Sequence, residues 1–147
     1  MSINLKQNAD ASAGLQGTDG DEGGFVVLSF PYSANTNTTG AFLTASSAIM
    51  NRRMVVKAIT GVVDTAATNA VTAALWKAPS ATALASGVAL HSGTYNLQGT
   101  ANTNQALTLS TVSGALDVAA GSRIGFVISA APGAAGGGVI TVTLAPA

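Results

Sequence analysis

Cysteine is absent from this chain of 147 residues, and charged side chains are scarce. Without cysteine there is no disulfide framework, no thiolate metal site and no thiol nucleophile. Charged residues make up 8% of the sequence, against about 25% in an average soluble protein. The six basic and six acidic side chains balance, so the chain has no net charge to attract nucleic acid or an anionic membrane. We expect neither as a partner.

Aromatic residues make up only 5% of the chain, although the apolar total reaches 48%. No stretch approaches the roughly 18 consecutive apolar residues that span a bilayer. Residues 1–24 lack the basic and apolar regions of a secretory signal, so we expect synthesis in the cytoplasm of the cell that makes the protein. A surface low in charge is poorly protected from association, which favours a protein that works attached to copies of itself or to a partner.

Residues 1–24 differ in composition from the rest of the chain. Large apolar side chains are scattered there, and four of the six acidic residues lie within it: Asp10, Asp19, Asp21 and Glu22. Such a segment buries too little apolar surface to fold by itself, so we predict an extended or flexible N-terminal arm over 1–24. The folded domain is then expected to cover 25–147.

From residue 25 onward, short apolar runs alternate with turn residues. The run FVVLSFPY (25–32) is almost continuously apolar, which predicts a strand buried on both faces. RMVVKAITGVVDT (53–65) is rich in β-branched residues, with Gly61 placed for a bulge or bend. Apolar residues alternate with others at 124–128 and at 139–144, as in half-buried antiparallel strands.

About eight or nine short strands, without a long amphipathic helix, predict an all-β antiparallel sandwich. A jelly roll best fits the strand count and loop lengths, and an immunoglobulin-like order stays open. The Asn residues of ANTN (101–104) suit a turn, because Asn tolerates a left-handed backbone conformation. Gly121 is expected to supply the turn before Arg123, whose side chain should lie on the face opposite Ile124 and serve the architecture.

Catalytic patterns are not evident. His91 is the only histidine, no G-x-S-x-G motif is present, and we predict an exposed strand residue. Asp64 and Asp117 stand near predicted strand ends, the usual solvated position. DGDEGG (19–24) lacks the further oxygen ligands of a calcium loop, and PGAAGGG (132–138) lacks the Lys and Ser/Thr of a phosphate loop. The sequence therefore predicts a protein that is not an enzyme and holds no metal or cofactor.

The basic residues Arg52, Arg53 and Lys57 form the only positive cluster. One interpretation places both arginines at a surface strand start, with Lys57 and Lys77 guarding strand edges. Another pairs this cluster with the acidic N-terminal segment of a neighbouring subunit, or with a complementary partner surface. Trp76, the sole tryptophan, is expected in the core or at a subunit interface.

The part of the chain from 53 to 147 resembles small Ala/Thr-rich structural proteins of tailed bacteriophages. The resemblance is carried by RMVVKAITG, LWKAPSATALASG, LHSGTYNLQGTANTNQALTLS, AAGSRIGFVIS and GGGVITVTLAPA. It implies a capsid decoration (cement) protein, a jelly-roll homotrimer on the outside of the head that locks neighbouring major capsid proteins together. The resemblance supplies no catalytic residues.

On this reading the partners are the major capsid protein and copies of the chain itself, and the location is the outer surface of the virion. The residues expected at capsid or subunit contacts are Ile3, Leu5, Lys6, Asp19, Asp21, Glu22, Arg52, Arg53 and Trp76. The alternative is a glycan-binding or receptor-binding module of a phage tail or fibre, which would have the same sandwich and bind ligand through its loops. Scarce aromatic residues argue against that alternative.

Overall fold

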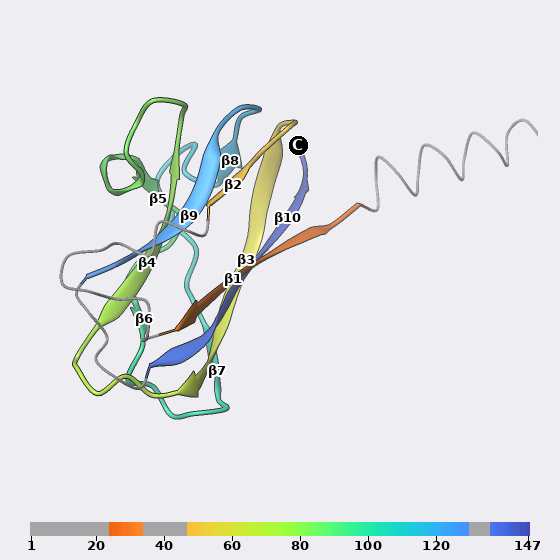
Figure 1. Ribbon diagram of the computed structural model, residues 1–147. Helices are drawn as coiled ribbons and strands as arrows, with labels where there is room; N and C mark the ends of the chain where they lie inside the picture. The colour runs from red at the N-terminus through yellow and green to blue at the C-terminus, as the bar shows by residue number, and fades with distance from the viewer. Residues whose placement is uncertain (1–23, 34–46, 130–135) are drawn as a thin grey trace, which may run out of the picture.

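The computed structural model describes residues 24–33, 47–129 and 136–147, and within them the chain forms two facing β-sheets (Figure 1). Sheet A has the order β1-β10-β3-β7, and β8 also pairs with β3. Sheet B has the order β2-β9-β4-β5, and β6 also pairs with β4. Every pairing is antiparallel. The prediction of an all-β antiparallel sandwich is confirmed.

The strands differ widely in length. Those of sheet A are β1 (Val26–Ser33), β3 (Met54–Thr65), β7 (Asn104–Ala106), β8 (Asp117–Val118) and β10 (Gly137–Pro146). Those of sheet B are β2 (Ser47–Ile49), β4 (Thr72–Ala78), β5 (Val88–Ala89), β6 (Tyr95–Asn96) and β9 (Arg123–Ile128). A short 3₁₀ turn, η3 (Leu84–Ser86), lies between β4 and β5. No helix among the described residues is long and apolar enough to cross a lipid bilayer.

The described residues contain more strands than the eight or nine predicted, because the run at 88–97 is divided. β5 and β6 are separated by a loop in which Gly93 has a φ of 74°, a conformation that breaks regular pairing. A second loop contains Asn102 with a φ of 59°, which confirms the predicted left-handed turn in ANTN (101–104).

Strand pairing is nested along the chain. β1 pairs with β10 and β2 with β9, while β3 pairs with β7 and β8, and β4 with β5 and β6. The first strand thus meets the last, the second meets the last but one, and pairing closes inward to the turn after β4. Each sheet is therefore built from both halves of the chain.

The core lies between the sheets and follows the predicted alternation. In β10, Ile140 and Val142 are fully buried, whereas Val139, Thr141 and Thr143 are half-buried on the outer face. In β9, Ile124 and Phe126 are buried in the same way, and Arg123 starts the strand on the opposite face. Successive side chains of a strand point to opposite faces, so these predictions from sequence are confirmed.

β1 is an edge strand, with β10 as its one neighbour among the described residues. Phe30 and Tyr32 are buried, but Phe25 and Val27 are exposed on the outer face. The prediction of a strand buried on both faces is therefore wrong, because no layer of the described residues covers the outer side of sheet A here. Pro31 fits the edge position, where a missing N–H is tolerated.

Two register shifts occur between β3 and β10, and the extra residues on β3 are Lys57 and Asp64. The prediction of a bulge at Gly61 is wrong. Gly61 pairs in regular register and faces the core, where a Cβ atom would lie 2.6 Å from Cε2 of Tyr95. Lys57 is exposed and lies between the parts of β3 that pair with β8 and with β7, so the interpretation that it guards a strand edge stays a prediction.

Candidate functional site

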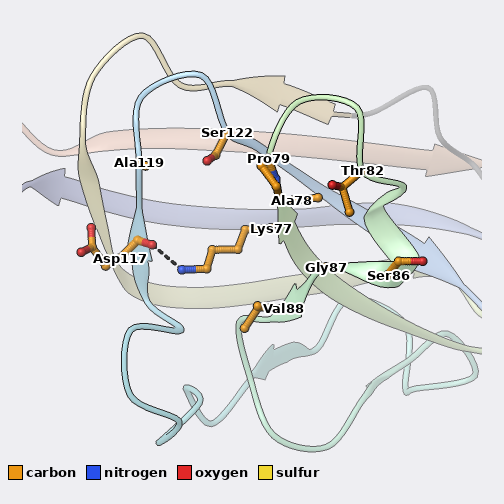
Figure 2. Close-up of a pocket in the computed structure, with 10 residues that line it drawn as sticks. All are labelled: Lys77, Ala78, Pro79, Thr82, Ser86, Gly87, Val88, Asp117, Ala119 and Ser122. Atoms are coloured by element: carbon orange, nitrogen blue, oxygen red, sulfur yellow. Dashed lines mark hydrogen bonds between the residues drawn. The ribbon is translucent and has the colours of Figure 1, made fainter.

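The sandwich is hollowed at one open edge, where β8 borders sheet A and β5 borders sheet B. This edge cavity has a volume of about 320 Å³ (Figure 2). Its walls are mostly apolar, with Ala78, Val88 and Ala119 among the lining residues. Hydroxyl groups of Thr82 and Ser122 and the side chain of Lys77 add polar atoms. Apolar walls with a few polar groups are typical of a binding site.

Lys77 is the cation of the edge cavity. It occupies an inward-facing position of β4, and its Nζ donates a hydrogen bond to the main-chain carbonyl of Asp117 (Figure 2). The same Nζ donates a second hydrogen bond to the main-chain carbonyl of Gly114. The prediction that Lys77 guards a strand edge is wrong, because β4 lies between β9 and β5. Burial lowers the pKa of the Lys77 ammonium, and the nearby Asp117 carboxylate partly opposes that effect.

Asp117 carries the only carboxylate among the residues that line the cavity. Its Oδ1 accepts a hydrogen bond of 2.9 Å from Nε of Arg53, and its Oδ2 accepts a second from Nη2. The guanidinium holds the pKa of Asp117 below its usual range. Both groups reach solvent, which screens the pair. Arg53, predicted as part of a basic contact cluster, is therefore already paired within its own chain, whereas Arg52 is exposed beside it.

Arg123 does not line the cavity but is bonded to Thr82, which does. In the register of β4 and β9 it stands opposite Ala78, and its Nη2 donates to the carbonyl of Thr82. Its Nε is buried and finds no hydrogen-bond partner among the described residues. Gly121, with a φ of 80°, forms the predicted turn before it. The guanidinium thus holds the loop after β4 against β9, as the architectural interpretation predicted.

Trp76 faces outward from sheet B, away from the core. It borders a hollow of about 190 Å³ together with Val127 and the hydroxyl-bearing residues Thr72, Thr94 and Ser129. The main-chain N–H of Thr72 donates to Oγ of Ser129 over 3.1 Å. Sequence singled out the tryptophan, but the hydroxyl groups come from three separate segments that only folding brings together.

His91 is buried, with 4% of its surface exposed, so the prediction of an exposed histidine is wrong. Its Nε2 accepts a hydrogen bond of 2.9 Å from the main-chain N–H of Leu75. The ring proton therefore lies on Nδ1, which is 3.3 Å from the carbonyl oxygen of Ser92. Burial lowers the pKa of the imidazole. His91 fastens the loop after β5 to β4.

The predicted contact residues do not form one cluster. Arg53 immediately precedes β3 of sheet A, and Trp76 lies on the outer face of sheet B. Within residues 24–33, 47–129 and 136–147, no group of three His, Asp or Glu side chains is placed to hold a metal ion. The other predicted contacts lie outside the described residues, as does the predicted arm up to residue 23: Ile3, Leu5, Lys6, Asp19, Asp21 and Glu22.

Known proteins give no direct guide to this site. Comparisons with protein families, curated proteins and solved structures found no match. Function is therefore inferred from the sandwich, its exposed strand edge and its two hollows.

Proposed function

We propose that the protein is a structural component of a tailed-bacteriophage virion that binds the outside of the capsid and stabilises contacts between major capsid proteins. The observation that carries this proposal is the apolar start of the edge strand β1. Phe25 is 64% exposed and Val27 59% exposed, on a chain with few charges. Contiguous exposed apolar side chains mark interaction sites on soluble proteins.

The nested strand order supports the finer proposal of a jelly roll. If β5 with β6, and β7 with β8, are each counted as one interrupted strand, eight strands remain and pair first with last, inward along the chain. Jelly rolls are eight-stranded double sheets and are common in viral capsids. Fold alone does not assign function, so this order adds weight only together with the exposed edge.

On this proposal the protein works by binding and not by catalysis. Its partners are the major capsid protein and further copies of the chain, arranged as a homotrimer on the outer surface of the virion. A ligand that binds an assembled state but not its free parts stabilises that state by mass action. The sparse charge and the apolar edge are suited to such contacts.

Cosedimentation with phage heads assembled without this protein tests the proposal. The double variant Phe25→Ser with Val27→Ser is compared with wild type, and Val112→Ser is the control because Val112 is 67% exposed in a loop far along the chain. Burying such a side chain contributes about 1.5–3 kcal/mol, so the double variant should bind at least about tenfold more weakly. Failure of the wild type to bind heads would overturn the proposal.

A glycan-binding module is a second candidate, favoured by the hollow beside Trp76. An aromatic ring flanked by hydroxyl groups can contact the apolar face and the polar rim of a sugar. Because Trp76 is the only tryptophan, its fluorescence reports directly on that hollow. If the protein is a glycan-binding module, titration with a panel of soluble glycans should change this emission, and Trp76→Ala should abolish binding measured by calorimetry. An unchanged emission across the panel would exclude it.

A further inference from the structure

Charge is divided unequally between the sandwich and the N-terminal segment. The described residues contain five basic side chains and two acidic ones, a formal charge of +3. Residues 1–23 contain one basic and four acidic side chains, a formal charge of −3. The neutrality of the whole chain therefore comes from two oppositely charged parts, and each part is electrostatically suited to bind the other.

Of the five cations of the sandwich, one lines the edge cavity and two are bonded to residues that line it. Lys77 lines it, Arg53 lies beside it through Asp117, and Arg123 is bonded to a carbonyl of its wall. Asp117 is the only acid near them among the described residues, because Asp64 stands at the opposite end of β3. Positive charge is thus in excess at this edge.

The excess is not neutralised by the direct partners of Lys77. Its ammonium donates to two main-chain carbonyls, which are dipoles without net charge, and the carboxylate of Asp117 is engaged by Arg53. A partly desolvated cation in an apolar hollow interacts strongly with an incoming anion, because water screens the pair less there. The group that best complements the cavity is therefore a carboxylate.

We propose that the edge cavity binds the acidic tract of a second copy of the chain, the carboxylates of Asp19, Asp21 and Glu22. The contact is then formed between two different surfaces, the tract of one subunit and the cavity of the next. Such a contact closes into a ring or continues as an open chain. The homotrimer proposed above is one closed form of it.

The position of β1 explains why the tract comes from another copy. When the register of β1 and β10 is continued to Gly24, this residue falls in one row across sheet A with Pro146, Met54 and Val118. It is nevertheless three strand spacings from β8, or about 14 Å. A chain advances at most about 3.6 Å per residue, so Asp21 reaches about 11 Å from Gly24 and Glu22 about 7 Å.

Measured between Cα atoms, only Asp19, five residues from Gly24, spans the gap within one molecule, whereas Asp21 would need a fully extended backbone and side chain. The start of β1 also projects away from the rest of the sandwich (Figure 1). A neighbouring subunit can present all three acids to the cavity together. This favours a contact between subunits over one within a chain.

The first experiment is the solution mass of the full chain by multi-angle light scattering. At about 50 mM NaCl, where the Debye length exceeds 10 Å, we expect the mass of an assembly of two or more chains of 14.3 kDa each. At about 1 M NaCl, where the Debye length is about 3 Å, the mass should fall toward that of one chain. A single-chain mass at low salt would overturn the proposal.

Two adjacent alanines offer a matched pair of cavity variants. Both are exposed, but Ala119 lines the cavity and Ala120 is not among its lining residues. Ala119→Glu places a carboxylate in the wall of the cavity that Lys77 also lines, so it should repel the tract and reduce the mass to that of one chain. Ala120→Glu adds the same charge and should retain the assembly. Equal masses for the two variants would overturn the proposal.

Variants of the tract complete the test. Replacing Asp19 and Asp21 by Asn and Glu22 by Gln should also give single chains, while Asp64→Asn, which removes an acid elsewhere, should not. A mixture of the tract variant with Ala119→Glu should form dimers, because one intact cavity then meets one intact tract. No complex in the mixture would contradict a contact between subunits. Since no capsid is present, these results are independent of the head-binding test.

Discussion

The hydroxyl groups of Tyr32 and Tyr95 lie 3.3 Å apart and form a hydrogen bond across the sandwich. Tyr32 belongs to β1 of sheet A and Tyr95 to β6 of sheet B, and their rings meet edge to face with centroids 6.2 Å apart. The two side chains are almost completely buried. They therefore connect the edge strand that carries the exposed apolar residues to the opposite sheet.

A double-mutant cycle should show that the two tyrosines are coupled. Tyr32→Phe or Tyr95→Phe alone leaves the other hydroxyl buried without its partner, which costs about 1–3 kcal/mol. The double variant removes both hydroxyls, so its loss of stability should be smaller than the sum of the single losses. Urea unfolding of the four proteins measures the difference. Additive losses would show that the bond contributes nothing.

Alkaline pH should destabilise the protein through the same pair. Burial raises the pKa of both tyrosines above the ordinary value of about 10. The unfolded chain therefore loses its tyrosine protons first, and stability falls as the pH rises above about 10. In the double Phe variant this part of the fall should disappear. The comparison is made by thermal unfolding between pH 8 and 11, in steps of about half a unit.

Replacing Gly61 by alanine should destabilise the core. The added methyl group would lie 2.6 Å from Cε2 of Tyr95, and overpacking of this kind costs about 1–3 kcal/mol. Gly137→Ala is a control in the same sheet, because its nearest neighbour would be the carbonyl oxygen of Tyr32 at 3.6 Å, an ordinary contact. If urea midpoints of the two variants coincide, Tyr95 is not held tightly by β3.

Acid should weaken the attachment of the loop that contains His91. Burial lowers the pKa of the folded-state imidazole, so the unfolded chain takes up a proton more readily. The stabilisation is complete above the ordinary histidine pKa of about 6.5 and is lost as the pH falls from there toward the folded-state pKa. The slope contributed by this one group is at most about 1.4 kcal/mol per pH unit. His91→Gln, which keeps an acceptor for the N–H of Leu75, should flatten the profile between pH 5 and 7, measured in steps of about half a unit.

Gly87→Ala should open the wall of the edge cavity. A Cβ atom there would lie 2.0 Å from the carbonyl oxygen of Lys77, so β5 would have to move away from β4. We expect faster hydrogen exchange at the amide of Leu90, which bonds to the carbonyl of Leu75 over 3.0 Å. Ser86→Ala, an exposed change next to it, should leave that exchange unaltered. Protection of Leu90 that survives Gly87→Ala would contradict this account.

Local pattern predicted much of the sandwich but not the placement of its strands. Alternation at 124–128 and 139–144 was sufficient to assign the buried faces of β9 and β10, because side-chain direction in a strand is a local property. The run at 25–32 was misread, since apolar residues fit both an inner strand and an edge strand. The role of Gly61 was also missed, because Tyr95 is distant in sequence.

At the candidate site, too, single unusual residues could be predicted from the sequence, whereas contacts between distant segments could not. Arg53 and Trp76 were singled out as unusual residues in a sparsely charged, aromatic-poor chain. The edge cavity was not predicted, since Lys77, Thr82 and Asp117 come from different segments and the ammonium of Lys77 bonds to Asp117 only through its main-chain carbonyl. A main-chain carbonyl is present at every residue, so composition carries no signal for it.

The class of fold, the faces of the regular strands and the separation of acidic from basic segments could all be predicted from residue type and short spacing. Which strands form edges, that His91 is buried, and that Lys77 and Asp117 meet at one cavity could be seen only in the folded protein. These features depend on antiparallel pairing between residues that are far apart in the chain, and the nested order of that pairing brings the first and last strands together.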